Sequence, residues 1–363
     1  MMVHRETLLR VLCQMLGKRI VESDCQTRQL QGGTLGDVQL ITGTAQSIDG
    51  EQLPYKLVWK TQQIWERPGD PNSWHREYDL YCSDLDASFS DSFRWPTCYY
   101  AQRHADAIEI WMEYIEGISG NDLTTEMHEA AALEIGRYQG RQYVQPTLAR
   151  SASGLGDAEF MQREHAQWYR QLFTADFLMS DQSTLAEHLK QMLRDKQIVL
   201  QTGKSFEYGY LRSAGCGIPE HLRQMLIDMD DRHAQFFENI KSLPVVLCHR
   251  DFWNTNIFYA EGKIRLIDWD TSGWGYLGED IASLIVDGTE IDRVDECYQR
   301  LFPAYLQGIS EAMDISQIND FYLRDMILIK FGYRMLQDYI FSSSSDVREE
   351  QVEILQKIYE WGK

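Results

Sequence analysis

The stretch that decides the fold runs from Val245 to Asp270 and reads VVLCHRDFWNTNIFYAEGKIRLIDWD. An apolar run leads into a polar loop that holds His249, Asp251 and Asn256, and a second apolar stretch follows. Short apolar runs bounded by polar residues are typical of buried strands. Asp268 comes twelve residues after Asn256, at the end of a further strand-like run. The segment therefore predicts strand, loop and strand, with polar groups gathered at the loop and at the strand end.

The spacing H-x-D-x-x-x-x-N followed by a second Asp supplies the parts that phosphoryl transfer needs. A carboxylate such as Asp251 orients an attacking hydroxyl and accepts its proton. The side-chain oxygens of Asn256 and Asp268 are hard donors of the kind that magnesium prefers. The alternative interpretation is a polar hairpin in which Asp and Asn make only local turn hydrogen bonds.

This loop resembles the catalytic loop of the aminoglycoside phosphotransferase and choline kinase superfamily, which shares the protein-kinase fold. The resemblance extends from about residue 28 to residue 282 and is densest in 245–282. It implies an α+β, protein-kinase-like bilobal fold, with a small β-rich N-lobe, a large helical C-lobe and the active site in the cleft. It also implies that Asp251 is the catalytic base, that Asn256 and Asp268 bind magnesium, and that His249 supports the loop as part of the catalytic group.

Two more acids follow the loop. Asp270 is the second acid of a D-x-D, at the place where protein kinases carry Asp-Phe-Gly. The sequence Glu279-Asp280-Ile281-Ala282 resembles a helix start of the family in which the Asp is structural. We expect Asp280 to brace the catalytic loop or to cap a helix.

A kinase fold also needs a strand lysine for the nucleotide phosphates and a helix glutamate to pair with it. Lys56 and Lys60 are four residues apart in one strand-like run, so both lie on the same face. We favour Lys60 because it ends an aliphatic run, and Lys56 is its rival. Val58, on the same face, would then cover the adenine. The expected partner is Glu77, in a Trp-His-Arg-Glu-Tyr run that resembles the family's helix start.

The rest of the nucleotide site carries weaker signals. Gly33 lies in a Gly-Gly-Thr-Leu-Gly turn between two predicted strands, where backbone amides can cover phosphates, although the full G-x-G-x-x-G is absent. The expected hinge to the adenine runs from Met112 to Ile115 and would use the backbone groups of Glu113 and Ile115.

Hydrophobic periodicity divides the chain into two parts. It predicts a helix over Glu6–Leu16, strands between residues 28 and 60, a helix over Trp74–Leu85 and a strand over Ile108–Tyr114. Mostly helical patterns follow, outside the 245–270 segment. We expect a nucleotide-binding lobe over 1–115 and a catalytic and acceptor-binding lobe over 116–363.

The acceptor is predicted to be a small hydroxylated molecule. The segment from Asp268 to Asp280 is short and has no A-P-E element, so it offers no platform for a peptide. Trp253, Trp274, Tyr276 and Asp270 lie next to the catalytic elements and are the candidate acceptor contacts. The rings would stack on a sugar or an alkylammonium, or alternatively pack the lobe core.

Composition narrows the function classes. The 363 residues carry a formal net charge of −20, the reverse of what a backbone-binding nucleic-acid protein shows. The N-terminus lacks a secretory signal, no apolar run is long enough to cross a membrane, and the seven cysteines are scattered, so we expect a cytoplasmic protein. The acidity suits a cationic acceptor, or solubility alone.

The sequence thus favours a phosphotransferase that uses ATP or GTP with magnesium to phosphorylate a hydroxyl of an aminoglycoside-like or amino alcohol acceptor. The alternative is a catalytically inactive kinase-fold protein that binds nucleotide or a protein partner. Oligomeric state is left open.

Overall fold

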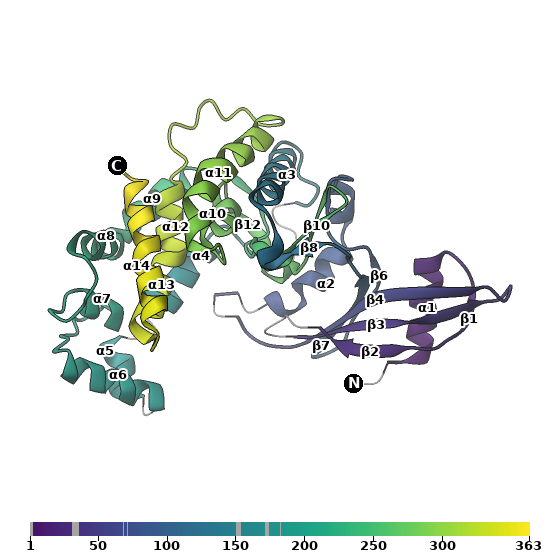
Figure 1. Cartoon of the computed structure of the whole chain (residues 1–363), viewed down its shortest axis with the longest axis horizontal. Helices are drawn as coiled ribbons and strands as arrows, with labels where there is room; N and C mark the ends of the chain where they lie inside the picture. The colour runs from purple at the N-terminus through teal and green to yellow at the C-terminus, as the bar shows by residue number, and fades with distance from the viewer. Residues whose placement is uncertain are drawn as a thin grey trace.

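An antiparallel sheet of six strands forms the N-terminal part of the computed structural model, in the order β1-β3-β4-β7-β6 with β2 paired to β3. The structure describes residues 3–30, 36–67, 69–70, 72–149, 154–170, 174–181 and 183–363. The strands are β1 (Ile20–Ser23), β2 (Gln26–Gln29), β3 (Gly36–Ser47), β4 (Gln52–Gln63), β6 (Cys98–Arg103) and β7 (Ala107–Glu113). Figure 1 shows this sheet at one end of the molecule and the helices of the C-terminal part at the other.

The alternation of side chains along β4 decides which groups face the catalytic cleft. Leu57 and Trp59 pack with Leu12 of helix α1 (Arg5–Leu16) in one buried cluster, and Trp59 stacks on Trp111 with ring centroids 5.2 Å apart. Because successive strand residues point to opposite faces, Lys60 lies on the other face. The predicted N-terminal helix is confirmed, and its role is to cover the back of the sheet.

The C-terminal part is mainly helical, as predicted. Its helices are α3 (Thr125–Val144), α4 (Phe160–Glu164), α5 (Ala175–Ser180), α6 (Thr184–Asp195), α7 (Phe206–Leu211), α8 (Glu220–Asp231), α9 (His233–Lys241), α10 (Glu279–Val286), α11 (Val294–Ser310), α12 (Leu323–Ile327), α13 (Tyr333–Phe341) and α14 (Ser345–Glu360). Two π-helical segments, η4 (His165–Arg170) and η8 (Leu328–Gly332), continue α4 and α12. The two π-helical segments are in contact: Nδ1 of His165 lies 3.2 Å from the carbonyl oxygen of Ile329.

Helices α3 and α11 approach closely because both carry glycine at their crossing. A Cβ on Gly136 would lie 2.3 Å from the carbonyl oxygen of Tyr305, and one on Gly308 would lie 2.2 Å from that of Leu133. Only a residue without a side chain fits at either position. Helix α3 also packs against β9 (Val245–Cys248), the strand that leads into the loop holding Asp251. The α3–α11 contact therefore supports that loop.

Two small sheets carry the catalytic loops. Strand β9 pairs with β12 (Gly273–Tyr276), and a second sheet has the order β5-β11-β10-β8. Its strands are β5 (Phe93–Arg94), β8 (Ile118–Ser119), β10 (Ile257–Ala260) and β11 (Lys263–Leu266). Residues 249–256 therefore connect β9 to β10, and residues 267–272 connect β11 to β12. The predicted strand–loop–strand layout is confirmed, and the two loops lie side by side.

The predicted helix over Trp74–Leu85 is wrong in its extent. The α-helix α2 covers only Arg76–Tyr81, between 3-10 turns at Ser73–His75 and Asp84–Ser88. The break has a local cause, because the Ser83 hydroxyl accepts a hydrogen bond of 3.2 Å from the amide of Leu85 and caps the second turn. Figure 1 shows α2 between the large sheet and the helical part.

The bilobal, kinase-like fold class is confirmed, with a β-rich N-terminal part and a helical C-terminal part. Leu85, Phe93 and Trp95 belong to the same buried cluster as the C-terminal helices. Some side chains that precede residue 115 therefore pack with the second part. In the part of the chain that the structure describes, no helix is both long and apolar enough to span a membrane.

Candidate active site

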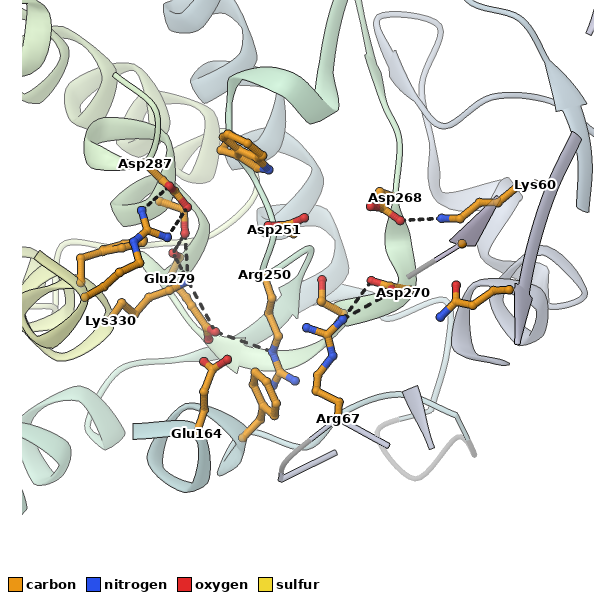
Figure 2. Close-up of a pocket in the computed structure, with 18 residues that line it drawn as sticks. Lys60, Arg67, Glu164, Arg250, Asp251, Asp268, Asp270, Glu279, Asp287 and Lys330 are labelled. Atoms are coloured by element: carbon orange, nitrogen blue, oxygen red, sulfur yellow. Dashed lines mark hydrogen bonds and ion pairs between the residues drawn. The ribbon is translucent and has the colours of Figure 1, made fainter. Parts of the chain in front are cut away.

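A cavity of about 440 Å³ lies where the two loops meet the large sheet. Its lining comes from both parts of the chain and is largely charged: Gly36, Lys60, Gln62, Arg67, Phe160, Glu164, Arg250, Asp251, Trp253, Asp268, Asp270, Thr271, Glu279, Ser283, Asp287, Lys330, Phe331 and Arg334. Figure 2 shows Asp251 between Lys60 and Asp268 on one side and Glu279, Asp287 and Lys330 on the other.

The loop that holds Asp251 is fixed from below by Asp280. The two carboxylate oxygens of Asp280 accept hydrogen bonds from the backbone amides of His249, at 2.8 Å, and Arg250, at 2.7 Å. Gln139 Nε2 donates a third bond of 2.7 Å. Asp280 is fully buried, and burial raises its pKa. The expected brace is confirmed, and the loop is preorganised by a buried carboxylate.

His249 is a positioning residue that lies beneath the loop and does not line the cavity. It is fully buried, with Nε2 3.0 Å from the carbonyl oxygen of Ile267 and its ring edge-on to Trp269 at 4.8 Å. Burial lowers the pKa of His249, so the imidazole is neutral at pH 7. The contact between His249 and Ile267 joins the first loop to the second, which agrees with a supporting role. Because His249 is buried beneath the loop, it has no access to reacting atoms.

Asp251 faces the cavity and is oriented by Asn256. The amide nitrogen Nδ2 of Asn256 donates to Asp251 Oδ2 at 2.7 Å and to the backbone oxygen of Asp251 at 2.9 Å. Burial, together with the negative charge of Asp268, raises the pKa of Asp251 to about 6. A carboxylate with a pKa near the working pH is well matched to accepting a proton.

Lys60 joins the sheet to the catalytic loops. Its Nζ lies 2.6 Å from Glu77 Oε2 and 2.5 Å from Asp268 Oδ1. Burial alone lowers the pKa of Lys60, but the charges of Asp268 and Glu77 outweigh it and raise the pKa above its ordinary value. The pKa of Asp268 is lowered, because the attraction of Lys60 outweighs its burial. Lys60 and Glu77 thus form the expected lysine–glutamate pair.

Lys56, the rival lysine, points elsewhere. It is exposed and forms an ion pair with Glu116 at the surface. The two lysines share a strand face, but only Lys60 lines the cavity. The geometry therefore favours Lys60 as the phosphate-binding residue.

The second acid of the D-x-D lies next to a buried arginine network. Arg76 makes two bonds of 2.7 Å to Asp70 and one of 3.0 Å to the backbone oxygen of Asp270. Burial and the charge of Asp268 raise the pKa of Asp270 to about 7. Asp268 has a left-handed backbone, φ +66°, a region that Asp tolerates better than most residues. Together these contacts fix where the two carboxylates point.

The donor set near Asp251 fits a magnesium ion whose coordination is completed by phosphate and water. The amide of Asn256 donates its nitrogen hydrogens to Asp251, so its oxygen is directed away from that carboxylate. Asp268 supplies a second hard oxygen donor nearby. Across the described ranges, no group of three or more His, Cys, Asp or Glu side chains is placed to hold a metal. A magnesium ion that binds together with a nucleotide needs only one or two protein carboxylates, because phosphates and water complete its coordination.

The expected adenine contacts lie outside the cavity. Val58 packs with Trp74 and Met112 in a separate buried cluster, on the cleft face of β4. Glu113, at the end of β7, bonds to Thr97 through both its backbone amide, at 2.9 Å, and its carboxylate, at 3.0 Å. Ile115 is buried. Gly33, expected to cover the phosphates, falls outside the described residues. The adenine contacts stay predictions as well.

Of the three aromatic residues expected at the acceptor, the structure places one in the cavity. Trp253 lines it. Trp274 and Tyr276 are only 4% and 7% exposed and belong to the core of the C-terminal part. Their strand, β12, pairs with β9 and is covered on both faces, so these rings pack the core and do not reach an acceptor.

Several cavity residues were missed by sequence reasoning. Glu164 ends α4, Asp287 follows α10, and Lys330 lies in the π-helical segment η8. The carboxylate of Glu164 faces the cavity, and no described residue makes a hydrogen bond or ion pair with it (Figure 2). Arg250 was visible inside the loop motif, but the other three come from separate helices and no local spacing links them.

Arg250 holds a segment of the helical insert against the catalytic sheet. Its Nη2 donates to the carbonyl oxygens of Asp157, at 2.6 Å, and Trp274, at 2.5 Å. Gly156 and Gly273 form a parallel bridge beside it, and a Cβ on either would lie within 2.7 Å of Arg250 Nη1. Both glycines are therefore required by the close packing of the guanidinium.

A two-lobed fold with a lysine–glutamate pair, a D-x-x-x-x-N loop and a following Asp defines the kinase-like phosphotransferases. The chain belongs to the phosphotransferase enzyme family, whose sequence model matches residues 96–315, well over half of the chain. The resemblance noted in the sequence is confirmed, and the protein is an enzyme of the phosphotransferase family.

Individual relatives are more distant. Human ethanolamine kinase 1 is 35% identical over 77 residues, which are 19% of this chain and 17% of that protein. A choline kinase from Cryptosporidium parvum shares the fold with a TM-score of 0.51 and 13% identity, covering 93% of this chain and 89% of that one. A microcompartment-associated aminopropanol kinase has a TM-score of 0.52 and 12% identity, covering 98% and 95%.

Proposed function

We propose that the protein transfers the γ-phosphoryl group of ATP to a hydroxyl of a small, amine-bearing acceptor, with magnesium as cofactor. The observation that carries this proposal is the convergence of Asp251, Asp268 and the Lys60–Glu77 pair on one cavity. These groups come from three separate parts of the chain. The identity of the nucleotide base rests on the family alone, so GTP is the alternative donor.

Each residue then has one task. The Asp251 carboxylate orients the acceptor hydroxyl and takes its proton as the oxygen attacks phosphorus. Lys60, held by Glu77, binds the nucleotide phosphates. Asn256 and Asp268 would hold the magnesium, which neutralises charge on those phosphates. His249 and Asp280 hold the loop so that these groups are in place before the substrate binds.

The adenine would lie against the cleft face of β4. Val58 is on that face, two residues before Lys60, and is half-buried. The backbone groups of Glu113 and Ile115 would meet the base edge, and the Gly33 turn would cover the phosphates. These four assignments rest on the resemblance to the family.

The acceptor would bind in the half of the cavity beyond Asp251. Glu164, Glu279 and Asp287 bring three carboxylates to this half. Glu279 lies near Arg250 and Lys330, and Asp287 pairs with Arg334, so Glu164 is the carboxylate that no described cation pairs with. Burial raises the pKa of Glu164, so a bound ammonium would stabilise its charged form. Trp253 adds aromatic surface that attracts cations, whereas the ring of Phe160 already faces the guanidinium of Arg250, 4.7 Å from the centroid. The curated relative is named an ethanolamine kinase and one solved relative an aminopropanol kinase, and both names describe amino alcohol acceptors.

Other features of the molecule follow from this function. The partners would be nucleotide and a small acceptor, with no nucleic acid, because the net charge of −20 opposes binding to a phosphate backbone. We propose the division into lobes at residue 115, between the end of β7 and the start of β8, and a cytoplasmic location where ATP and magnesium are abundant.

The direct experiment is a coupled ADP-release screen across amino alcohols, aminoglycosides and neutral sugars. We expect acceptor-dependent release with at least one amine-bearing alcohol and none with sugars that lack an amine. A thermal-shift measurement with ATP and magnesium accompanies the screen, because a ligand at 100 times its Kd adds about 2.7 kcal/mol of stability.

The two measurements separate the competing functions. A thermal shift without ADP release from any acceptor would favour a nucleotide-binding protein that does not catalyse transfer. The absence of any shift at millimolar nucleotide would contradict the proposed function outright. The variant Glu164→Gln sharpens the acceptor assignment: it should raise the KM of an amine acceptor about tenfold and leave kcat within twofold.

A further inference from the structure

Arg67 is a cavity residue that the proposed function does not use. It lies in the segment between β4 and the turn η1 (Ser73–His75), where the amide of Asp70 donates to the carbonyl oxygen of Arg67 at 2.9 Å. The carboxylate of Asp70 is held by two bonds of 2.7 Å from the buried Arg76. The backbone that presents Arg67 is therefore anchored to the same network that fixes Asp270.

The guanidinium of Arg67 is positioned but only loosely bonded. It lies over the ring of Trp65, 4.9 Å from the centroid, and its Nε donates to Ser73 Oγ at 3.4 Å. Its Nη2 lies 3.5 Å from both carboxylate oxygens of Asp270. Charge-assisted bonds between arginine and a carboxylate are normally about 2.7–2.9 Å long. The pairing with Asp270 is thus long enough to be exchanged for a stronger one.

The other cations that line the described cavity are committed to shorter bonds. Lys60 lies 2.5 Å from Asp268, and Arg250 lies 2.6 Å from a backbone oxygen. Lys330 donates to Ser283 Oγ at 2.9 Å, and Arg334 forms a close ion pair with Asp287. Among these cavity-lining cations, Arg67 is the one whose hydrogen bonds are all long, at 3.4–3.5 Å, and Figure 2 shows it pointing at Asp270.

The charge of Arg67 also reaches all three acids of the reaction centre. It acts to lower the pKa values of Asp251, Asp268 and Asp270. Burial outweighs it at Asp251 and Asp270, whereas the pKa of Asp268 is lowered overall, chiefly by Lys60. A guanidinium at this place faces the group that would be transferred. Arginine is suited to such a position, because its planar set of donors matches phosphate oxygens and its charge does not depend on pH.

We propose, on the basis of the proposed function, that Arg67 leaves Asp270 when the magnesium nucleotide binds and donates hydrogen bonds to the oxygens of the phosphoryl group in transfer. In that step the acceptor oxygen forms its bond to the γ-phosphorus and gives its proton to Asp251. The bond from the γ-phosphorus to the bridging oxygen breaks, and its electron pair leaves with ADP. Arg67 gains and loses no proton, and it stabilises the charge that spreads over the phosphoryl oxygens.

The test compares Arg67→Gln, Arg67→Lys and wild type for binding of two ligands by calorimetry. One ligand is magnesium ADP, and the other is magnesium ADP with aluminium fluoride, a mimic of the group in transfer. We expect Arg67→Gln to bind magnesium ADP within twofold of wild type and the mimic at least tenfold more weakly. Its kcat should fall about 10²–10³-fold, the cost of removing one preorganised donor. Arg67→Lys should retain part of the affinity for the mimic.

Arg103→Gln is the matched control. Arg103 likewise lies over a tryptophan ring, at 5.2 Å from Trp74, with a carboxylate oxygen of Asp79 at 3.9 Å, but it does not line the cavity. It should match wild type for both ligands and for turnover.

Three results would overturn the assignment of Arg67: an unchanged affinity for the mimic, equal losses for both ligands, or an unchanged kcat. Failure of the proposed function looks different, because the wild-type protein itself would then bind no magnesium ADP or transfer no phosphoryl group.

Discussion

The catalytic loop and the acceptor wall are built in opposite ways. The loop that carries Asp251 is fixed by buried groups close to it in sequence, chiefly His249 and Asp280, whose bonds to backbone atoms are 2.7–3.0 Å long. The acceptor wall is assembled from α4, α10 and η8, and Glu164 within it has no partner among the described residues. The rigid loop suits a catalytic step that needs its groups in constant positions. The unpaired carboxylate of Glu164 suits an acceptor that brings a positive charge.

The largest effect should come from Asp251→Asn. The variant keeps the size of the side chain but cannot accept a proton, so kcat should fall about 10³-fold, in the range for losing a general base. Steady-state kinetics with the best acceptor measures this loss. Calorimetry should find magnesium ADP binding within about threefold of wild type. Equal loss of binding and turnover would contradict the role of Asp251 as base.

The next largest effect should separate the two lysines of β4. Lys60→Ala removes the partner of Glu77 and Asp268, and should lower kcat/KM for ATP about 10²-fold or more, because it also leaves buried carboxylates unpaired. Lys56→Ala should change it less than twofold, since Lys56 pairs at the surface with Glu116. The reverse order would show that the wrong lysine has been assigned.

A smaller effect, on stability, should distinguish the loop from the wall. Asp280→Asn replaces one of the two accepting oxygens with an NH2 group, so one of the buried amides of His249 and Arg250 loses its acceptor. The free energy of unfolding should fall by about 2–3 kcal/mol. Urea denaturation measures it. Glu164→Gln should not lower the same quantity, because no described residue pairs with that carboxylate and burial raises its pKa. If both variants lost a similar free energy of unfolding, the proposed contrast between the rigid catalytic loop and the unpaired Glu164 would be contradicted.

The smallest effect concerns pH. Burial and Asp268 raise the pKa of Asp251 to about 6, so the folded state binds its proton more tightly than the unfolded state does. Stability should therefore fall as pH rises from about 4 to 6, and Asp251→Asn should escape this loss. The variant should melt about 2–4 °C above wild type at pH 8 and within 1 °C of it near pH 4. A difference independent of pH would contradict the raised pKa.

Activity should follow the same titration. As pH falls below about 6, Asp251 becomes protonated and can no longer accept the hydroxyl proton, so kcat/KM for the acceptor should decline on the acid side. Measured pH profiles of the nucleotide-saturated enzyme test this directly. If kcat/KM stayed constant down to pH 5, the pKa of the base in the nucleotide complex would have to lie well below about 6.

The sequence was informative wherever function depends on local spacing. Short local patterns predicted the catalytic loop, Asp268 at the end of its strand and the brace at Asp280. The pairing of Lys60 with Glu77 followed from the strand and helix that a kinase fold requires. The structure agrees with the geometry expected of each. What remains a proposal is the chemistry that these groups perform.

Tertiary packing decided the rest. Trp274 and Tyr276 lie near the loops in sequence, but the pairing of β12 with β9 buries both rings. Arg67 and Glu164 reach the cavity from segments separated by about a hundred residues, and neither sits in a recognisable motif. The break after α2 depended on the cap made by the Ser83 hydroxyl. No pattern in the sequence alone assigns these positions.

The most direct test of the central claim is mass spectrometry of an amine-bearing alcohol after incubation with the protein, ATP and magnesium. The account predicts that the acceptor gains one phosphoryl group on a hydroxyl, in proportion to the ADP formed, and that a chelator of magnesium abolishes the product. Formation of ADP at the same rate with no acceptor present, and no phosphorylated product from any alcohol tested, would contradict it.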